Sequence, residues 1–157
     1  MASPVTCNLI IAATFLGGIL AGATFDRMIV QMPAWRRLGV RAWAEYSRKA
    51  DLGNGLVFYP LVAIGGAVFT IAGAVAFHFD QTTPRSAAVP IYGAAVMVIG
   101  GLLATIKAAP KMLSLKRVND EDGLQKALRG FHRWSAVRAV PQVLAFIANL
   151  WSLVSVL

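Results

Sequence analysis

Polar residues follow one face of the final apolar stretch of the chain, which runs from Phe131 to Leu157. They recur at alternating steps of three and four residues, the spacing that places side chains on one face of an α-helix. This face consists of Ser135, Arg138, Gln142, Ala145, Asn149 and Ser152. In water a polar stripe faces solvent, but in a bilayer it must face protein, because unpaired polar groups in hydrocarbon are costly. The spacing therefore predicts hydrogen-bond donors inside a membrane protein.

Arg138 is the residue of this face that could take part in a reaction. A cationic donor over a partly dry pocket stabilises a phenolate or an enolate. Two structural alternatives are that its guanidinium snorkels to the lipid headgroups, or that it pairs with Glu45 as a structural lock. The same snorkelling alternative applies to Lys107. The residues that we expect to contact a ligand on the inner faces are Gln142, Asn149, Tyr59, Thr70 and Lys107.

The sequence offers no metal site. Its two histidines, His78 and His132, fall at opposite ends of apolar runs, about 30 Å apart if the hydrocarbon core lies between them. Cys7 is the only cysteine, so no thiol-based metal spacing exists. Phosphate-binding glycine loops and paired carboxylates within the apolar runs are also absent. We therefore expect neither a metal nor a carboxylate-driven proton relay.

The composition is that of a membrane protein. Of the 157 residues, 57% are hydrophobic and 14% are charged, and the mean hydropathy is +0.64. A net charge of +8 would suggest nucleic acid in a soluble protein, but these charges lie in two loops between apolar runs. Such loop clusters fix topology and touch anionic lipid headgroups, so membrane lipid is the expected partner and nucleic acid is not.

Four apolar runs approach or exceed the roughly 20 residues that a helix needs to cross a bilayer. They predict an all-α membrane fold, a single four-helix transmembrane domain over 1–157. Its crossings are expected at about 5–25, 56–79, 89–109 and 137–157. Within the first crossing, Thr14, Gly18 and Gly22 form a stripe of small residues. Such a stripe fits a homodimer interface or packing within the bundle, and we favour the second.

The first loop contains a basic amphipathic segment. Trp35, Leu38, Ala42, Trp43 and Tyr46 share its apolar face, which suits an interfacial helix lying among headgroups. Alternatively, the segment folds beneath the bundle as a floor. Six lysines and arginines lie in this loop, one in the second loop and eight between residues 107 and 138. By the positive-inside rule, we expect both termini outside the cytoplasm, in a plasma membrane or the inner membrane of a bacterium.

The third loop predicts another helix. Asn119 or Asp120 can cap its start, where acidic residues precede basic ones. This helix can continue past Gly130 into the last crossing and kink at Pro141, whereas Pro110 stops or kinks the third crossing.

The pattern of short crossings resembles the anthrone-oxygenase-like family of small membrane proteins. The resemblance covers nearly the whole chain and is carried by the W-x-x-Y segment from Trp43 to Tyr46 and by RWSAVRAVPQVLAFIANLW before and within the last crossing. Some fungal members of the family are implicated in oxidising anthrones to anthraquinones without an evident cofactor. The resemblance implies roles for Trp43, Tyr46, Trp134 and Arg138.

The chain departs from the family where an Asn-x-Pro-x-Asn motif often closes the third crossing. Here Pro110 stands between Ala108 and Met112, which weakens the enzymatic interpretation and leaves the fold unaffected.

Two functions therefore remain open. The first is a cofactor-independent oxygenase, or a related pocket protein, for a small aromatic, phenolic or quinone-like molecule. Arg138 would supply the cation, Tyr46 or His132 the acid or base, and Trp43 a binding surface. The second is a non-enzymatic subunit that anchors a partner membrane protein or a second copy. An unsatisfied polar pocket favours the first, and a polar face filled by side chains favours the second. A transporter is less favoured, since no inverted repeat is visible.

Overall fold

The structure, a computed structural model, describes residues 3–157 and is built of helices joined by short turns. In this part of the chain four helical stretches are long and apolar enough to cross a membrane, and no strand occurs. They span Pro4–Leu38, Val40–Phe79, Arg85–Lys116 and Glu121–Val156. Each predicted crossing falls on one of these stretches, and the stretches extend well beyond the predicted crossings at the loop ends.

The first three stretches are composite. The first contains α1 (Pro4–Phe25), η1 (Asp26–Gln31) and α2 (Met32–Leu38). The second contains α3 (Val40–Lys49), η2 (Ala50–Asn54) and α4 (Gly55–Phe79). The third contains η3 (Arg85–Ala87), α5 (Ala88–Leu113) and η4 (Ser114–Lys116), and the fourth is the single helix α6 (Glu121–Val156). Gly39, with φ of 90°, makes the turn between α2 and α3, where most L-residues would be strained.

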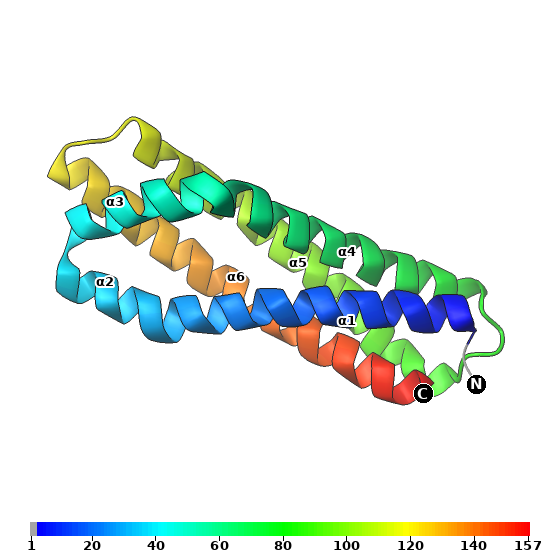
Figure 1. Cartoon of the computed structure of the whole chain (residues 1–157). Coiled ribbons are helices and arrows are strands. Elements are labelled where there is room, and N and C mark those ends of the chain that lie inside the picture. The colour runs from blue at the N-terminus through cyan, green and yellow to red at the C-terminus, as the bar shows by residue number, and fades with distance from the viewer. Residues whose placement is uncertain (1–2) are drawn as a thin grey trace.

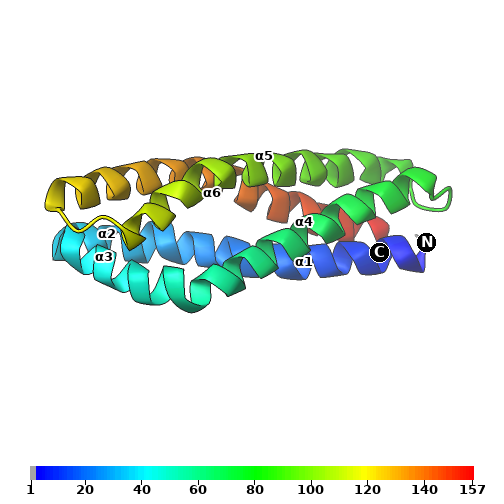
Figure 2. The same ribbon diagram turned by 90° about the horizontal axis from the view of Figure 1, so that it is seen from above.

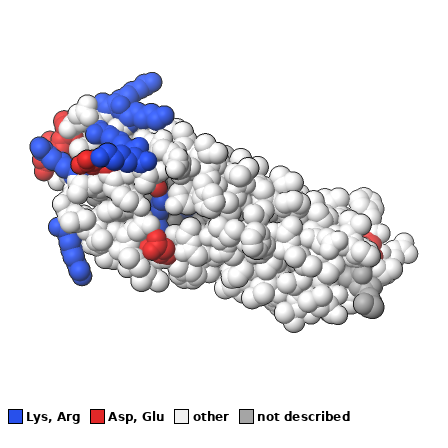
Figure 3. Space-filling view, in the orientation of Figure 1, with Lys and Arg blue, Asp and Glu red and all other residues white. Residues whose placement is uncertain are grey.

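The four long helices run side by side (Figures 1 and 2). The start of α1, the end of α6 and the α4–α5 loop lie at one end of the molecule (Figure 1). α2, α3 and the connection between α5 and α6 lie at the other end. Lys and Arg side chains gather over that second end, while the surface along the helices is almost free of charge (Figure 3).

A hydrophobic core fills the basic end. Its buried members come from α2, α3, the end of α5, η4 and the start of α6: Met32, Trp35, Trp43, Ala44, Met112, Leu115, Leu124, Ala127 and Phe131. Trp43 is fully buried, although the sequence also allowed it to face lipid headgroups. Leu38 and Tyr46 of the same predicted apolar face remain exposed. The contacts thus favour the alternative in which this segment folds beneath the crossings.

Glycines allow close helix contacts in the middle of the molecule. A Cβ atom placed on Gly66 of α4 would lie 3.5 Å from Leu16 of α1, and one on Gly18 would lie 3.2 Å from the Phe146 ring of α6. Gly22, by contrast, has no neighbour within 4 Å. The small-residue stripe of α1 therefore packs against α6 over part of its length, as the bundle-packing interpretation predicts.

The last stretch confirms the prediction of a long capped helix. α6 runs unbroken from Glu121 to Val156, past Gly130 and through Pro141. The Asp120 side chain accepts a hydrogen bond from the Gly123 amide at 2.8 Å, which satisfies one of the free N–H groups at the helix start. Pro110 does not stop α5, which ends three residues later.

Asp80 ties the N-terminal end of α1 to the α4–α5 loop. Its Oδ2 accepts hydrogen bonds from the Ser3 amide at 3.2 Å and the Thr6 hydroxyl at 3.1 Å. Its carboxylate also accepts from the hydroxyls of Thr82 and Thr83. These bonds, those from Thr82 and Thr83 above all, hold the pKa of Asp80 well below its usual range, because they favour the charged form.

We expect the Asp80→Asn variant to unfold at a lower temperature than the wild type at pH 7. Because the folded state lowers the pKa of Asp80, its contribution is complete above an unperturbed pKa of about 3.9 and is lost as the pH falls further. The difference in melting temperature should therefore narrow below about pH 4. Thermal scans in one detergent across this range test it, with Glu45→Gln, an exposed carboxylate, as control. A melting-temperature difference between Asp80→Asn and the wild type that stays constant with pH would show that the charged form of Asp80 does not stabilise the fold.

We also expect Gly18→Leu to destabilise the fold by about 1–3 kcal/mol, the usual effect of overpacking. The Phe146 ring leaves no room for the added side chain. Gly93→Leu is the matched control, since no atom lies within 4 Å of its Cβ position. Thermal unfolding of both variants in the same detergent decides the matter, and equal melting temperatures would show that Gly18 is not at a tight contact.

Candidate functional site

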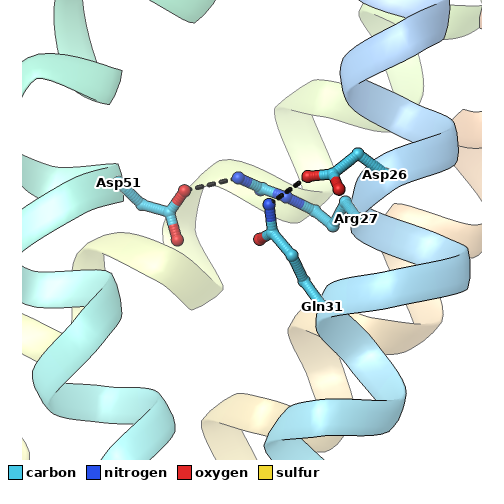
Figure 4. Close-up of polar contacts among 4 residues, drawn as sticks. All are labelled: Asp26, Arg27, Gln31 and Asp51. Carbon is cyan, nitrogen blue, oxygen red and sulfur yellow. Dashed lines mark hydrogen bonds and ion pairs between the residues drawn. The ribbon is translucent and has the colours of Figure 1, made fainter.

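A buried ion pair joins the first and second helical stretches (Figure 4). Arg27 Nη2 lies 2.5 Å from Asp51 Oδ1, and the two side chains are only 11% and 6% exposed. The second carboxylate oxygen of Asp51, Oδ2, is buried and accepts no hydrogen bond from the residues that the structure describes. A buried charge is costly unless all its hydrogen-bonding positions are used, so Asp51 has capacity for a further donor.

Both partners of the pair lie in π-helical segments. Arg27 belongs to η1 and Asp51 to η2. The wider turn of a π-helix is rare and is often found at functional sites. Gly53, with φ of −89° and ψ of −121°, interrupts the helix two residues after Asp51. Local backbone irregularities on two different stretches therefore bring the two charges together.

Aromatic rings flank the guanidinium of Arg27. Its Cζ lies 5.2 Å from the centroid of the Tyr59 ring on α4 and 5.6 Å from that of the Phe131 ring on α6. Cations are attracted to ring faces at such distances, more strongly where water is scarce. Arg27 is thus held from α4, α6 and η2 at once, which fixes its position.

Arg138 of α6 has no such partner. Its Nε is buried without a hydrogen bond, and within residues 3–157 no side chain forms an ion pair with it. The predicted lock between Arg138 and Glu45 is wrong, because Glu45 is exposed and pairs with Lys49 at 3.0 Å. One turn beyond Arg138, Gln142 Oε1 accepts a hydrogen bond from the Thr24 hydroxyl at 2.9 Å. Arg138 is thus a partly buried cation whose buried Nε donor is unused among the described residues.

These groups surround a cavity of about 500 Å³, within the size range of small-molecule sites. Its polar lining comes from Arg27, Asp51, Tyr59, Thr105, Arg138 and Gln142, and its other walls are apolar side chains of α1, η2, α4, α5 and α6. Two guanidinium groups and one carboxylate leave a formal charge of +1. The cavity therefore complements a molecule with one anionic oxygen and an apolar body.

A second, much smaller cavity of about 40 Å³ lies further along the polar face of α6. It shares Gln142 and Thr105 with the larger cavity and reaches Thr70 and Asn149. Asn149 Nδ2 donates to Thr70 Oγ1 at 3.1 Å, and Thr70 in turn donates to the Gly66 carbonyl at 2.8 Å. The polar face is thus closed by its own side chains here and open only around Arg138.

The structure brings together only some of the predicted site residues. Arg138, Gln142 and Tyr59 line the large cavity, while Asn149 and Thr70 line the small one.

Four predicted residues lie outside both cavities. The Tyr46 ring packs at a tilt of 49° against that of Trp35, with ring centroids 5.5 Å apart. His132 contacts Arg36, whose Nη2 lies 3.3 Å from each ring nitrogen. Trp43 packs in the core with its ring 6.3 Å from that of Phe131, and Lys107 is exposed. Tyr46, His132, Trp43 and Lys107 are therefore absent from the lining of both cavities, and their roles at a ligand stay predictions.

Sequence reasoning did not place Arg27 or Asp51 at the site. Arg27 closely follows one apolar run and Asp51 closely precedes the next, so both look like ordinary loop charges in the sequence. The available signal was position, since Arg27 comes two residues after the first crossing and Asp51 five residues before the second. Charges so near the ends of crossings can turn inward as easily as outward.

The described residues contain no group of three or more His, Cys, Asp or Glu side chains able to hold a metal ion. Comparisons with known proteins give no match, whether with protein-family models, curated proteins or solved structures. The site is accordingly interpreted from its own geometry.

We expect strong coupling between Arg27 and Asp51. Arg27→Gln or Asp51→Asn alone should each destabilise the protein by about 3–5 kcal/mol, because each leaves an uncompensated buried charge. The double variant should lose much less than the sum. Arg41→Gln and Glu121→Gln provide the matched control at an exposed ion pair, where effects of about 0–1 kcal/mol should add. Denaturant unfolding measures these variants together with the Arg41→Gln/Glu121→Gln double variant, and additive losses at Arg27 and Asp51 would refute the pairing.

Proposed function

We propose that the protein is an integral membrane protein whose large cavity binds a small aromatic molecule with an acidic oxygen, of the phenolic, anthrone or hydroxyquinone class. The observation that carries the proposal is Arg138 in a largely apolar cavity, because its buried Nε has no hydrogen-bond partner and its guanidinium forms no ion pair with a described residue. An anionic oxygen at this position would satisfy the unused donors. The rings of Tyr59 and Phe131 would pack against the flat body of the ligand.

The chemistry that this arrangement supports is oxygenation without a cofactor. Asp51 Oδ2, which has no hydrogen-bond partner among the described residues, would accept the acidic proton of the substrate. Arg138 would stabilise the resulting oxyanion. For an anthrone, the carbanion form would donate an electron to dioxygen, and the two radicals would combine into a peroxide. Loss of water from this peroxide leaves the quinone, so one oxygen atom enters the product and the other departs in water.

The open polar cavity supports this function over a non-enzymatic membrane subunit. The subunit alternative requires a polar face that is filled by its own side chains. That condition holds around Asn149 and Thr70, where the hydrogen bonds are internal. It does not hold around Arg138, Asp51 and the 500 Å³ beside them.

We expect Arg138 to determine binding of a monoanionic probe. The probe is 2-hydroxy-1,4-naphthoquinone, and its affinity for the purified protein in detergent can be measured by calorimetry. Arg138→Gln should weaken binding by about 10-fold to 100-fold, the equivalent of about 1.5–3 kcal/mol for a hydrogen bond to a charged group. Arg138→Lys should fail to restore the affinity, because an ammonium cannot reproduce the planar fork.

Two controls sharpen this measurement. Lys107→Gln removes an exposed cation outside the cavity and should leave the affinity unchanged. The neutral 1,4-naphthoquinone should bind the wild type and Arg138→Gln equally. In a parallel assay, wild-type protein should accelerate oxygen uptake by anthrone, and Asp51→Asn should not. Absence of probe binding to the wild type, or equal losses in Arg138→Gln and Lys107→Gln, would refute the proposal.

The same proposal includes the placement of the chain in the membrane. The four long helices would form a transmembrane bundle, with α2, α3 and the basic residues at the cytoplasmic surface. The start of α1 and the end of α6 would face the other side of a plasma membrane. The amphipathic residues of α2 and α3 that stay exposed, such as Leu38 and Tyr46, would contact the interface.

We expect a phosphatase fused to the C-terminus to be active and a fluorescent protein fused there to be dark in a bacterial host. The reason is the excess of Lys and Arg in the first and third loops. A fusion to the α4–α5 loop near Gln81 is the matched control and should behave in the same way. A bright C-terminal fluorescent fusion with an inactive phosphatase fusion would show that the C-terminus lies in the cytoplasm, opposite to the proposed orientation.

A further inference from the structure

The outward-facing part of the cavity wall lies entirely on two helices. Among the residues that line the large cavity, the exposed ones all belong to α4 and α5: Leu56, Pro60, Ile64, Ile106, Ala109 and Leu113. The lining residues of α1, η1, η2 and α6 are buried or only partly exposed. The cavity therefore reaches the surface of the protein on its α4–α5 side.

The exposed lining residues form two apolar edges. Leu56, Pro60 and Ile64 recur every four residues and so share one face of α4. Ile106, Ala109 and Leu113 follow at steps of three and four on α5. Neither edge carries a charged or hydrogen-bonding side chain. We call these six residues the rim.

The backbone of α4 favours an opening here. The end of α4 and the start of α5 lie together at their connecting loop, and the two helices separate toward the middle of the molecule (Figure 2). Pro60 lies within α4 on the rim and lacks the N–H for one helical hydrogen bond. Gly53 breaks the helix just before α4 starts. These two irregularities let the first turns of α4 tilt away from α5.

Packed side chains lie toward both ends of the cavity. The core with the fully buried Trp43 and Leu115 fills the basic end, where the Arg27–Asp51 pair lines the cavity. Toward the other end the polar face narrows to the 40 Å³ cavity. The rim holds the exposed residues of the lining, and it lies on helices of membrane-spanning length and hydropathy.

We propose that the rim is a lateral entrance from the hydrocarbon layer, and that the ligand is a membrane-dissolved amphiphile with an acidic ring head and an alkyl chain. This inference rests on the proposed function for the identity of the head. The head enters between α4 and α5, its anionic oxygen meets Arg138, and its chain remains between the rim residues among the lipid tails. An apolar rim admits such a molecule, whereas a small water-soluble anion would have to cross hydrocarbon to reach the same site.

The entrance can be tested without any ligand. A nitroxide is attached at Thr105→Cys, inside the cavity, in a Cys7→Ser background, and the protein is placed in lipid nanodiscs. Collisions should be frequent with lipid-soluble dioxygen and rare with a water-soluble nickel chelate. Ile64→Trp with Ile106→Trp should reduce the dioxygen collisions. Val68→Trp with Val96→Trp is the matched control, because these residues lie on the same helices, are similarly exposed and are outside the cavity lining.

A second arm uses a 3-alkyl-2-hydroxynaphthoquinone delivered from vesicles and measured by stopped-flow absorbance. The tryptophans on the rim should slow association by about tenfold, while the control pair should leave it within about twofold. Nickel access equal to dioxygen access, or identical results from rim and control variants, would overturn the lateral entrance. If the probe does not bind the wild type but the nitroxide shows access through the rim, the entrance stands and the proposed ligand head is wrong.

Discussion

The ion pair between Arg27 and Asp51 is the interaction on which the arrangement of the site depends. Two charges brought into a region of low dielectric must stay together, because separating them there is far more costly than in water. The ion pair therefore holds the first helical stretch against the second beside the cavity. Because Asp51 is paired with Arg27, it leaves Arg138 without a counter-charge among the described side chains. The cavity lining as a whole therefore carries one cation more than it has carboxylates.

The rest of the molecule can be understood as support for that pair. A core with two tryptophans packs at the basic end, and glycines of α1 and α4 allow close contacts with Phe146 of α6 and with α1 in the rest of the molecule. Asp80 fastens the opposite end, where hydrogen bonds from Thr82 and Thr83 keep its carboxylate charged. Packing is therefore tight at both ends and loose in the middle of one side, between α4 and α5. The residues that stabilise the bundle thus lie at its two ends, and the proposed entrance to the cavity lies between α4 and α5.

Much of the fold follows from the sequence because hydrophobic runs and helix caps are local signals. The four apolar stretches, the Asp120 cap and the continuous last helix were all predicted in this way. The inward face containing Arg138 and Gln142 was predicted from spacing alone. The partner of Arg27 was not, since it lies 24 residues away and depends on how two helices meet. Burial of Trp43 was left open for a similar reason, because an apolar face suits lipid and protein equally well.

The two π-helical segments have a consequence for how the chain tolerates changes in length. A π-helical turn holds one residue more than an α-helical turn over about the same distance, so it can absorb an extra residue while the helices before and after it keep their angular relation. A one-residue deletion in a regular α-helix rotates one flank by about 100° relative to the other. A one-residue deletion within 26–31 would instead leave a regular helix whose flanks stay in register. The segments that are poorest in regular hydrogen bonding are consequently those where a change in length is most easily absorbed.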